Sequence, residues 1–261
     1  MAILNKTQLI QRGVYYTPSA QETVTAGSTH TFSFQGYRGL KYGLNRILIS
    51  LAGGNLYDFL VSARILYSSG TVSLFPTNPK DSGISADALN DMFLGRSLRG
   101  AFIIDEQTSM EIDVQNTSAS DQTVNVQIMG YADVQLESLQ ADYAGQGKTF
   151  PRPFFISYPN TSIAAGTTNK QLPITLPRQS LRLYRMFVGS DSPGNLSLKI
   201  RQNTIYIKPQ VLASQLNDEF RYMDIILPID LDSRIPFQLY VDNLDVVNAH
   251  DISFIGETYI V

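Results

Sequence analysis

Alternation of apolar and polar residues dominates the chain and predicts half-buried β-strands. Residues 110–116, 237–243 and 124–131 each alternate the two classes. In the first of them the methionine, isoleucine and valine share one face, and the acidic residues and glutamine share the other. A period of two is that of a strand with one buried face. Because turn-forming clusters such as NTSASDQ and SDSPGN separate these segments, the pattern predicts an antiparallel all-β fold.

A short helix is written twice among these strands. The octets ADALNDMF and ASQLNDEF lie 127 positions apart and share the pattern A-x-x-L-N-D-x-F. In each octet a leucine and a phenylalanine four residues apart fall on one helical face: Leu89 with Phe93, and Leu216 with Phe220. We predict that these four residues are structural and buried under a β-sandwich, whose open end the helix covers. The Asn-Asp pair is expected either to face outward or to cap neighbouring backbone.

The strands around the two octets repeat at the same spacing. Residues 110–116 match residues 237–243 at the offset of 127, and after one residue is dropped Val126 matches Ile252. Upstream, TVTAGST echoes SIAAGTT at an offset of 139. Solenoid repeats are far shorter than this period. The repeat therefore indicates a duplicated domain.

The second copy gives the clearer strand count. Its predicted elements are strands at 154–158, 170–176, 181–188, 196–200 and 204–207, a helix at 211–220, and strands at 222–229, 235–243 and 251–260. A tight hairpin is expected through Gln202 and Asn203. The first copy fits the same count, with its helix at 86–93 and strands near 98–104, 110–116 and 123–134.

Eight short antiparallel strands with a helix between the fifth and sixth predict a two-sheet jelly roll. An immunoglobulin-type sandwich fits less well, since the chain has neither tryptophan nor cysteine for its core and that fold has no place for the helix. The predicted fold is thus all-β, with two tandem eight-stranded jelly-roll sandwiches.

The predicted organisation has four parts. An N-terminal arm covers residues 1–12, a first jelly roll 13–137, a linker 138–153 and a second jelly roll 154–261. The linker is placed where LESLQADYAGQGKTFPRP interrupts the strand pattern with glycine, glutamine and proline. No apolar run approaches the length of about 18 residues expected of a membrane span, and MAILNKTQLIQRG lacks the long apolar core of a signal peptide.

Composition adds two constraints. Charged residues make up only 16% of the 261 residues, which is low for a globular chain and is typical of surface that becomes buried in an assembly. The net charge of −3 gives no basis for steering toward nucleic acid, so no sequence-specific nucleic-acid binding is expected. The chain has no cysteine, which excludes disulfides and thiolate metal sites.

Catalytic and cofactor motifs are weak. The chain has two histidines, His30 and His250. A Ser-His-Asp triad would also need a serine nucleophile on a strained turn, and no G-x-S-x-G motif occurs, so no catalytic residue is assigned. GQGKT resembles a phosphate loop, but Asp142 occupies the position of the required glycine, and Pro151 and Pro153 oppose the required helix. We predict a linker there, no nucleotide site and no enzymatic activity.

Acidic residues near strand ends are the candidate metal ligands. Asp105 and Asp232 match at the offset of 127, and Asp230 lies beside the second of them. Carboxylates of this kind suit calcium, although no segment has EF-hand spacing. The two interpretations are a structural calcium ion at a subunit contact and solvated turns; no other cofactor is expected.

Two consecutive eight-stranded sandwiches, each with a helix between its fifth and sixth strands, resemble the double jelly-roll major capsid proteins of the tectivirus–adenovirus lineage. In size the chain is similar to the corticovirus-like capsid proteins of membrane-containing bacteriophages. The resemblance covers residues 13–261 and rests on architecture and duplication.

This resemblance implies a structural major capsid protein. Three chains with two sandwiches each would form a homotrimeric, pseudo-hexameric capsomer, because a closed three-fold of duplicated chains has six similar sides. It also implies a place in the capsid lattice of an icosahedral virion, assembly in the host cytoplasm, and contacts with vertex proteins and an internal membrane.

Two other functions fit the same sandwiches. A low-copy virion accessory protein, such as a spike base, an adaptor or a receptor-binding subunit, also uses jelly rolls. A tandem carbohydrate-binding β-sandwich would need exposed aromatic platforms, and the chain has no tryptophan.

Overall fold

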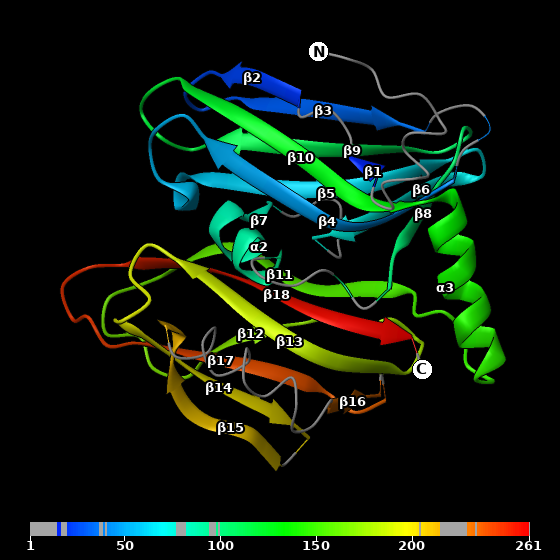
Figure 1. Ribbon diagram of the computed structural model, residues 1–261. Coiled ribbons are helices and arrows are strands. Elements are labelled where there is room, and N and C mark those ends of the chain that lie inside the picture. Colours follow the sequence, from blue (N-terminus) through cyan, green and yellow to red (C-terminus); the bar gives the residue numbers. More distant parts are fainter. Residues whose placement is uncertain are drawn as a thin grey trace.

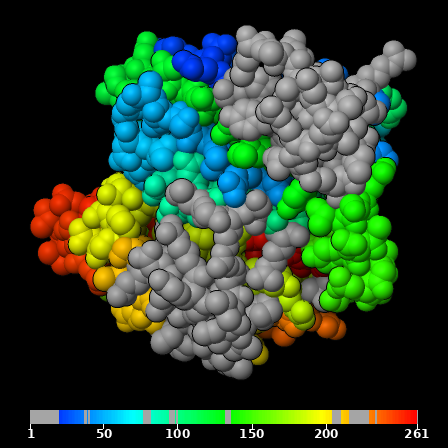
Figure 2. Space-filling model, viewed as in Figure 1, coloured from blue at the N-terminus to red at the C-terminus, as the bar shows by residue number. Residues whose placement is uncertain are grey.

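Two β-sandwiches lie against each other in the computed structural model of the chain. In Figures 1 and 2 the first is coloured blue to green and the second green through yellow to red. The structure describes residues 15–16, 20–36, 39, 41–76, 82–93, 98, 100–203, 205–214, 229–232 and 234–260.

The first sandwich consists of two five-stranded sheets. In one sheet the order is β1-β10-β4-β8, and β2 also pairs with β10: β1 (Tyr15–Tyr16), β2 (Ala20–Val24), β10 (Gln122–Ala132), β4 (Tyr42–Leu51) and β8 (Phe102–Ile104). In the other the order is β3-β9-β5-β6, and β7 also pairs with β5: β3 (Thr29–Gln35), β9 (Ser109–Asn116), β5 (Phe59–Tyr67), β6 (Gly70–Phe75) and β7 (Ile84–Ser85). A short 3-10 helix, η1 (Leu56–Asp58), precedes β5, and helix α2 (Ala86–Phe93) follows β7.

The second sandwich consists of two four-stranded sheets. The first sheet has the order β11 (Pro153–Ile163), β18 (His250–Ile260), β13 (Leu181–Ser190), β16 (Ile229–Leu231). The second has the order β12 (Lys170–Pro173), β17 (Phe237–Asn243), β14 (Leu196–Gln202), β15 (Ile205–Leu212).

Strand order confirms the predicted fold. When the strands of the second copy are numbered 1 to 8, its sheets read 1-8-3-6 and 2-7-4-5, and every pairing between described strands is antiparallel. The first copy has the same order once the two-residue strands β1 and β7 are set aside. This is the arrangement of the jelly roll, with both sheets packed face to face. Helix α2 lies between the fifth and sixth strands of the first copy, as predicted.

The second octet is only partly described. Ala213 and Ser214 are helical, while β15 extends to Leu212, so the helix begins two residues later than predicted. Leu216 and Phe220 lie outside the described residues, as do residues 222–228 of the predicted sixth strand. The hairpin between β14 and β15 is confirmed. Gln202, predicted in the turn, pairs with Ile205, so the turn begins one residue later, at Asn203 (φ 54°).

A helix that the sequence pattern does not predict occupies the first half of the predicted linker, residues 138–153. The strand predicted at 123–134 ends at Ala132, and helix α3 (Asp133–Gly145) follows at once, running along the side of the molecule between the two sandwiches (Figure 1). The segment is rich in Leu, Gln, Glu and Ala, which favour a helix, and its Leu136 is buried. Neither α3 nor any other helix among the described residues is long and apolar enough to cross a membrane.

The apolar residues of the alternating segments form the core of each sandwich. In β9 every second residue is buried, beginning with Met110, and Ile112 and Val114 have no exposed surface. They belong to the same apolar cluster as Val126 and Ile128 of β10, which is in the other sheet. Burying each such side chain contributes about 1.5–3 kcal/mol.

A buried asparagine closes the end of the second sandwich. Asn243, the last residue of β17, donates from Nδ2 to the carbonyls of Ile163 (3.0 Å) and Asn248 (2.9 Å). Its Oδ1 accepts a hydrogen bond from the backbone N–H of Asp245 (3.0 Å). One side chain therefore ties the end of β11 to the loop between β17 and β18.

The same bonds occur in the first copy. Asn116, the equivalent of Asn243, donates to the carbonyls of Val24 (3.0 Å) and Ser120 (2.9 Å) and accepts from the backbone N–H of Ser118 (2.9 Å). The duplication has thus kept the chemistry of this turn as well as the strand order.

Replacing either asparagine should be costly. We expect Asn243→Ala to lower the free energy of unfolding by about 2–4 kcal/mol, because buried carbonyls lose their donor. Asn116→Ala should have a similar effect, and the exposed Gln35→Ala should change little. Urea denaturation monitored by circular dichroism measures all three. Losses below about 0.5 kcal/mol at both asparagines would contradict this role.

Candidate functional site

The contact between the sandwiches is the main functional feature, and it begins with one sheet buried on both faces. In β18, Ile252 and Phe254 belong to the core of the second sandwich, whereas Ile255 belongs to that of the first. The intervening Ser253 and Glu257 are also fully buried. Because neighbouring side chains of a strand point to opposite faces, burial without alternation requires cover on both sides. The first sandwich supplies the outer cover.

Aromatic side chains fill the centre of this contact. The ring of Phe155, from β11, lies 5.6 Å from the rings of both Phe75 and Phe102 of the first sandwich. Phe187 of β13 joins the same apolar cluster. Such aromatic pairs add to the effect of burial, so the two sandwiches share one continuous apolar interior.

Helix α2 lies between the two sandwiches (Figure 1). It contacts β4 and η1 of the first and β13 and β18 of the second. Leu89, Met92 and Phe93 are fully buried. The sequence predicts a helix that covers one sandwich. In the structure the second sandwich covers the other side of this helix. The apolar stripe in the sequence does not reveal that second contact.

Asn90 fixes the helix to a sheet edge. Its Nδ2 donates to the carbonyl of Ile49 (2.6 Å), and its Oδ1 accepts from the N–H of Ile49 (2.9 Å). Strand β8 pairs with β4 only at residues 42–44, so the amide of Asn90 takes the place of a strand partner further along. Of the two expectations for the Asn-Asp pair, capping of backbone is confirmed for Asn90, which is 9% exposed.

A polar seam lies at a close approach of the two sandwiches. The backbone N–H of Ser85 donates to Oγ of Ser253 (3.0 Å), and the two hydroxyls are 3.2 Å apart. A Cβ atom on Gly189 would lie 1.7 Å from the Ser85 hydroxyl. Only glycine allows β13 to pass this close.

An ion pair is buried on the same outer face. Arg185 and Glu257 form a salt bridge with side-chain exposures of 5% and 0%, and the Tyr259 hydroxyl donates to the other oxygen of Glu257. The guanidinium also lies 5.8 Å from the centre of the Phe187 ring, in a cation–π contact.

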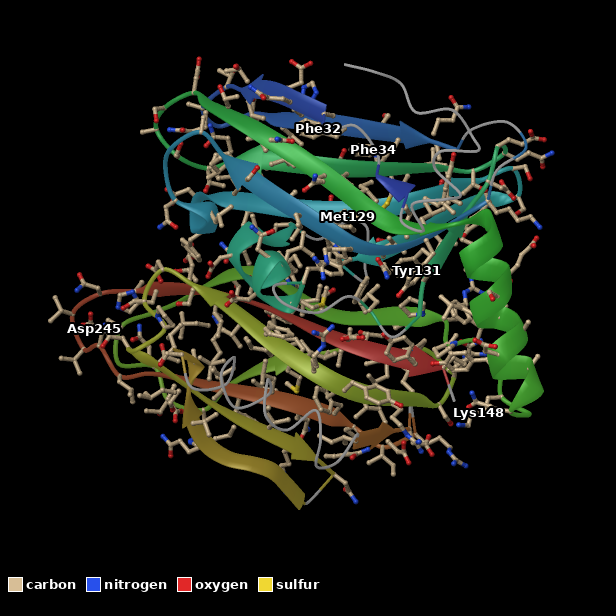
Figure 3. All side chains as sticks on the ribbon, viewed as in Figure 1. Phe32, Phe34, Met129, Tyr131, Lys148 and Asp245 are labelled. Atoms are coloured by element: carbon tan, nitrogen blue, oxygen red, sulfur yellow. The ribbon has the colours of Figure 1, made fainter. Side chains whose placement is uncertain are left out.

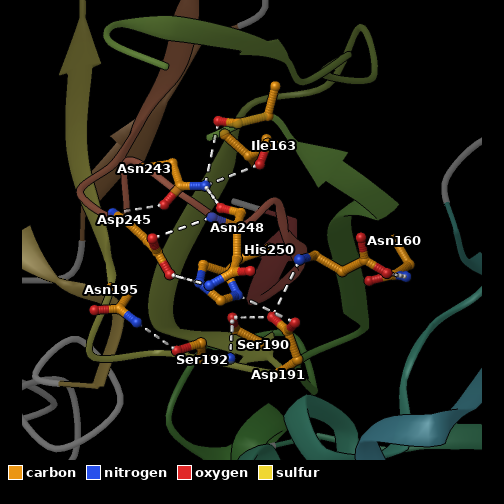
Figure 4. A network of polar contacts seen from close by, with 12 residues as sticks. Asn160, Ile163, Ser190, Asp191, Ser192, Asn195, Asn243, Asp245, Asn248 and His250 are labelled. Atoms are coloured by element: carbon orange, nitrogen blue, oxygen red, sulfur yellow. Dashed lines mark hydrogen bonds and ion pairs between the residues drawn. The ribbon is translucent and has the colours of Figure 1, made fainter. Parts of the chain in front are cut away.

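His250 bridges two loops of the second sandwich (Figure 4). Its Nδ1 lies 3.2 Å from Asp191 Oδ2 and its Nε2 lies 3.1 Å from Asp245 Oδ2. Ionised carboxylates only accept, so both ring nitrogens donate when the ring is the doubly protonated, cationic imidazolium. The bond to Asp191, followed by that to Asp245, raises the pKa of His250.

The network extends toward the first sandwich. Asp191 Oδ1 accepts from the N–H of Asp251 (3.1 Å), and Asp251 Oδ2 accepts from Nδ2 of Asn160 (3.3 Å). Burial, then the charges of Asp251 and Asp191, raises the pKa of Tyr57 in η1. His250, Asp251 and Asp245 are close in sequence, whereas Asp191 and Asn160 come from distant parts of the chain and complete the network.

The predicted metal ligands Asp105 and Asp232 lie in matching turns. Asp105 Oδ1 accepts from the N–H of Gln107 (3.0 Å) and from Thr108 Oγ1 (2.7 Å), and the Thr108 bond, the largest cause, lowers the pKa of Asp105. Asp232 Oδ1 accepts from the N–H of Arg234 (2.9 Å). The Arg234 side chain lowers the pKa of Asp232 to about 2. Hydrogen-bonded turns account for both carboxylates.

The third predicted ligand, Asp230, forms an ion pair with Arg182 at 2.6 Å. Among the described residues, no group of three or more His, Asp or Glu side chains is placed to hold a metal ion. The structural calcium ion stays a prediction.

The GQGKT segment ends a helix, whereas a phosphate loop precedes one. Helix α3 stops at Gly145, Gly147 has φ 69°, and the N–H of Lys148 donates to the carbonyl of Tyr143 (2.9 Å). Figure 3 places Lys148 beside the end of α3, at the opposite edge of the second sandwich from Asp245. These are the features of a helix C-terminus.

No protein-family model and no curated protein sequence matches the chain. By structure, it is similar to the major capsid protein P2 of bacteriophage PM2, with a TM-score of 0.43, 11% identity, and 93% of this chain and 98% of that one covered. A protein in the atomic structure of Sulfolobus turreted icosahedral virus gives a TM-score of 0.43 and 13% identity, covering 95% and 91%. An archaeal virus protein with a triple jelly-roll fold gives 0.24 and 12%, covering 97% and 61%.

Helix α2 provides the first test of the contact. We expect Leu89→Ala to lower the free energy of unfolding by about 2–5 kcal/mol and Leu89→Asp to prevent folding or assembly, because a carboxylate would replace a fully buried side chain. Leu216→Asp, outside the described residues, is predicted to act in the same way. Val72→Asp is the control, since Val72 is 43% exposed. Thermal unfolding separates these variants; a stable, assembling Leu89→Asp protein would overturn the placement.

The His250 network predicts a pH dependence. Since the folded pKa of His250 is raised, its contribution to stability is complete below the unfolded value of about 6.5 and is lost as the pH rises through the folded value. The free energy of unfolding of wild type minus that of His250→Gln should therefore be largest near pH 5.5 and fall by pH 9. Hydrogen bonds from Val247 first and Asn248 next keep the pKa of Asp245 low, so it stays ionised over this range. A flat difference in urea denaturation would contradict the bridge.

Proposed function

We propose that this chain is the major structural subunit of an icosahedral viral capsid. It assembles as a homotrimer whose six jelly rolls form a pseudo-hexameric capsomer. One observation carries the proposal: the same jelly-roll strand order occurs twice in one chain. A closed ring of three such chains contains six similar units, which is what a hexagonal tile requires.

The contact between the sandwiches supports a rigid tile. Linked domains that move relative to each other usually meet through modest polar surfaces. Here the two sandwiches share aromatic contacts, the buried Ser85–Ser253 hydrogen bonds and the buried Arg185–Glu257 pair. A capsomer of this kind presents fixed edges to its neighbours.

The remaining features of the proposal concern organisation and partners. Residues 1–12 act as an arm, 13–137 and 154–261 as the two jelly rolls, and 138–153, with the end of α3, as the connection. The chain acts as a structural protein, not as an enzyme. Its partners are further copies of itself in the capsid lattice, other virion proteins such as vertex proteins, and an internal membrane. It is assembled in the host cytoplasm.

Mass measurement tests the proposal directly. Native mass spectrometry of the purified protein should give three times the 29.0 kDa of one chain, and electron microscopy at high concentration should show capsid-like particles or sheets. A strictly monomeric protein at all concentrations would contradict the capsomer. Few copies per purified virion would favour the accessory function, and a clear hit in a glycan-binding screen would favour the carbohydrate-binding one.

A further inference from the structure

The loop between β17 and β18 exposes apolar side chains to water. Among the described residues five large apolar side chains are exposed, and three of them lie in this loop: Leu244 (51%), Val246 (80%) and Val247 (78%). Figure 2 shows the loop, in red, projecting from the second sandwich at the left edge of the molecule. Scattered single apolar residues are common on protein surfaces, whereas residues gathered in this way form an apolar tip.

Hydrogen bonds fix the backbone of this loop. Oδ1 of Asp245 accepts from the N–H groups of Val247 (2.8 Å) and Asn248 (3.1 Å) (Figure 4). The N–H of Leu244 donates to the carbonyl of Asn195 (2.8 Å). These bonds use backbone and polar groups, and neither exposed valine belongs to the apolar core of the second sandwich. Because the loop is ordered before a partner arrives, binding there costs less conformational entropy.

The fold does not require an apolar tip at this place. At the offset of 127 the two valines correspond to Ala119 and Ser120. In that loop Asn116 makes the backbone bonds that Asn243 makes in the second copy. Its sequence, TSASD, contains no large apolar residue. The same turn therefore forms with polar and small residues, and the valines serve a purpose other than the turn.

Three loops of the second sandwich meet at this tip and make it acidic: residues 164–169, 191–195 and 244–249. They contain Asp191, whose side chain is 40% exposed, and Asp245, but no lysine or arginine. His250 lies between these two carboxylates and offsets at most one of their charges. The strand residues Lys170 and Lys199 bond to oxygen atoms of the second sandwich itself. An anionic membrane is repelled by such a surface, whereas basic groups of a protein are attracted.

We propose that the tip formed by Leu244, Val246 and Val247 binds a protein partner, in an apolar pocket of that partner rimmed by lysine or arginine. A projecting apolar tip needs a concave complement, and the acidic loops around it select a basic rim. Valine has few rotamers and loses little side-chain entropy on binding. The inference goes beyond the proposed capsid subunit, because the tip and its loops belong to one sandwich of one chain.

Selection from a random dodecapeptide library displayed on phage tests this chemistry on the full-length protein. The selected peptides should combine large apolar residues with an excess of lysine and arginine. Their synthetic copies should bind at least about tenfold more weakly to the double variant Val246→Ser with Val247→Ser, because a few residues carry most of the affinity of an interface. Raising the salt concentration should also weaken their binding.

Two controls isolate the tip. Thermal unfolding of the double variant should match that of the wild type, because neither valine belongs to the core. Val72→Ser makes the same kind of change at another exposed valine, in β6, and should leave peptide binding unchanged.

The other outcomes separate this inference from its alternatives. Selected peptides without basic residues, or with equal affinity for the double variant, would overturn the stated partner. Phosphatidylcholine vesicles that bind the wild type but not the double variant would identify a membrane as the occupant, and loss of the trimer in the double variant would identify a second copy of this chain. A monomeric wild-type protein that binds the selected peptides through the valines would keep the inference and overturn only the proposed function.

Discussion

Burial of one sheet on both faces is the constraint on which the rest of the structure depends. An antiparallel sheet of a sandwich normally has one face in the core and one toward water. The sheet β11-β18-β13-β16 has no water-facing side over most of β18, so the first sandwich has to lie against it. This requirement explains the position of α2, the close passage of β13 at Gly189 and the aromatic cluster around Phe155. Each of them lies at the contact between that sheet and the first sandwich.

The two copies have kept their turn chemistry and changed their outer faces. Asn116 and Asn243 make the same backbone bonds, and Asp105 and Asp232 hold the same turn. These bonds are local to each jelly roll and serve both copies equally. The outer faces differ: Ser253 and Glu257 lie in the sheet that the first sandwich covers, and their equivalents in the first copy are Gln127 and Tyr131. Differences between duplicated strands therefore mark the surfaces on which the copies have different roles.

The sequence predicts the jelly rolls because their cores follow a period of two, and α2 because Leu89 and Phe93 follow a helical period. It does not predict α3: the glycines and prolines after Gly145 suggest an irregular connection and conceal the helix before them. It also misses the role of β18. An apolar or small residue on an outward position, such as Ser253 or Ile255, fits solvent or a neighbour equally well. The partners of His250 are hidden for another reason: Asp245 is five residues away, but Asp191 comes from a loop that only the fold brings to the histidine.

The buried ion pair of Arg185 and Glu257 shows what a contact between two sandwiches of one chain allows. Removing one partner of a buried ion pair is strongly destabilising, whereas a well-packed apolar pair in its place is often no worse. Such a pair is thus better at selecting one arrangement than at adding stability. Within a chain, the other sandwich is always present, so Arg185 and Glu257 are desolvated once, during folding, and stay paired. The first copy has Arg46 at the position of Arg185 and Tyr131 at that of Glu257. The pair of opposite charges is therefore specific to the sheet that the other sandwich covers, where both groups stay paired and out of water.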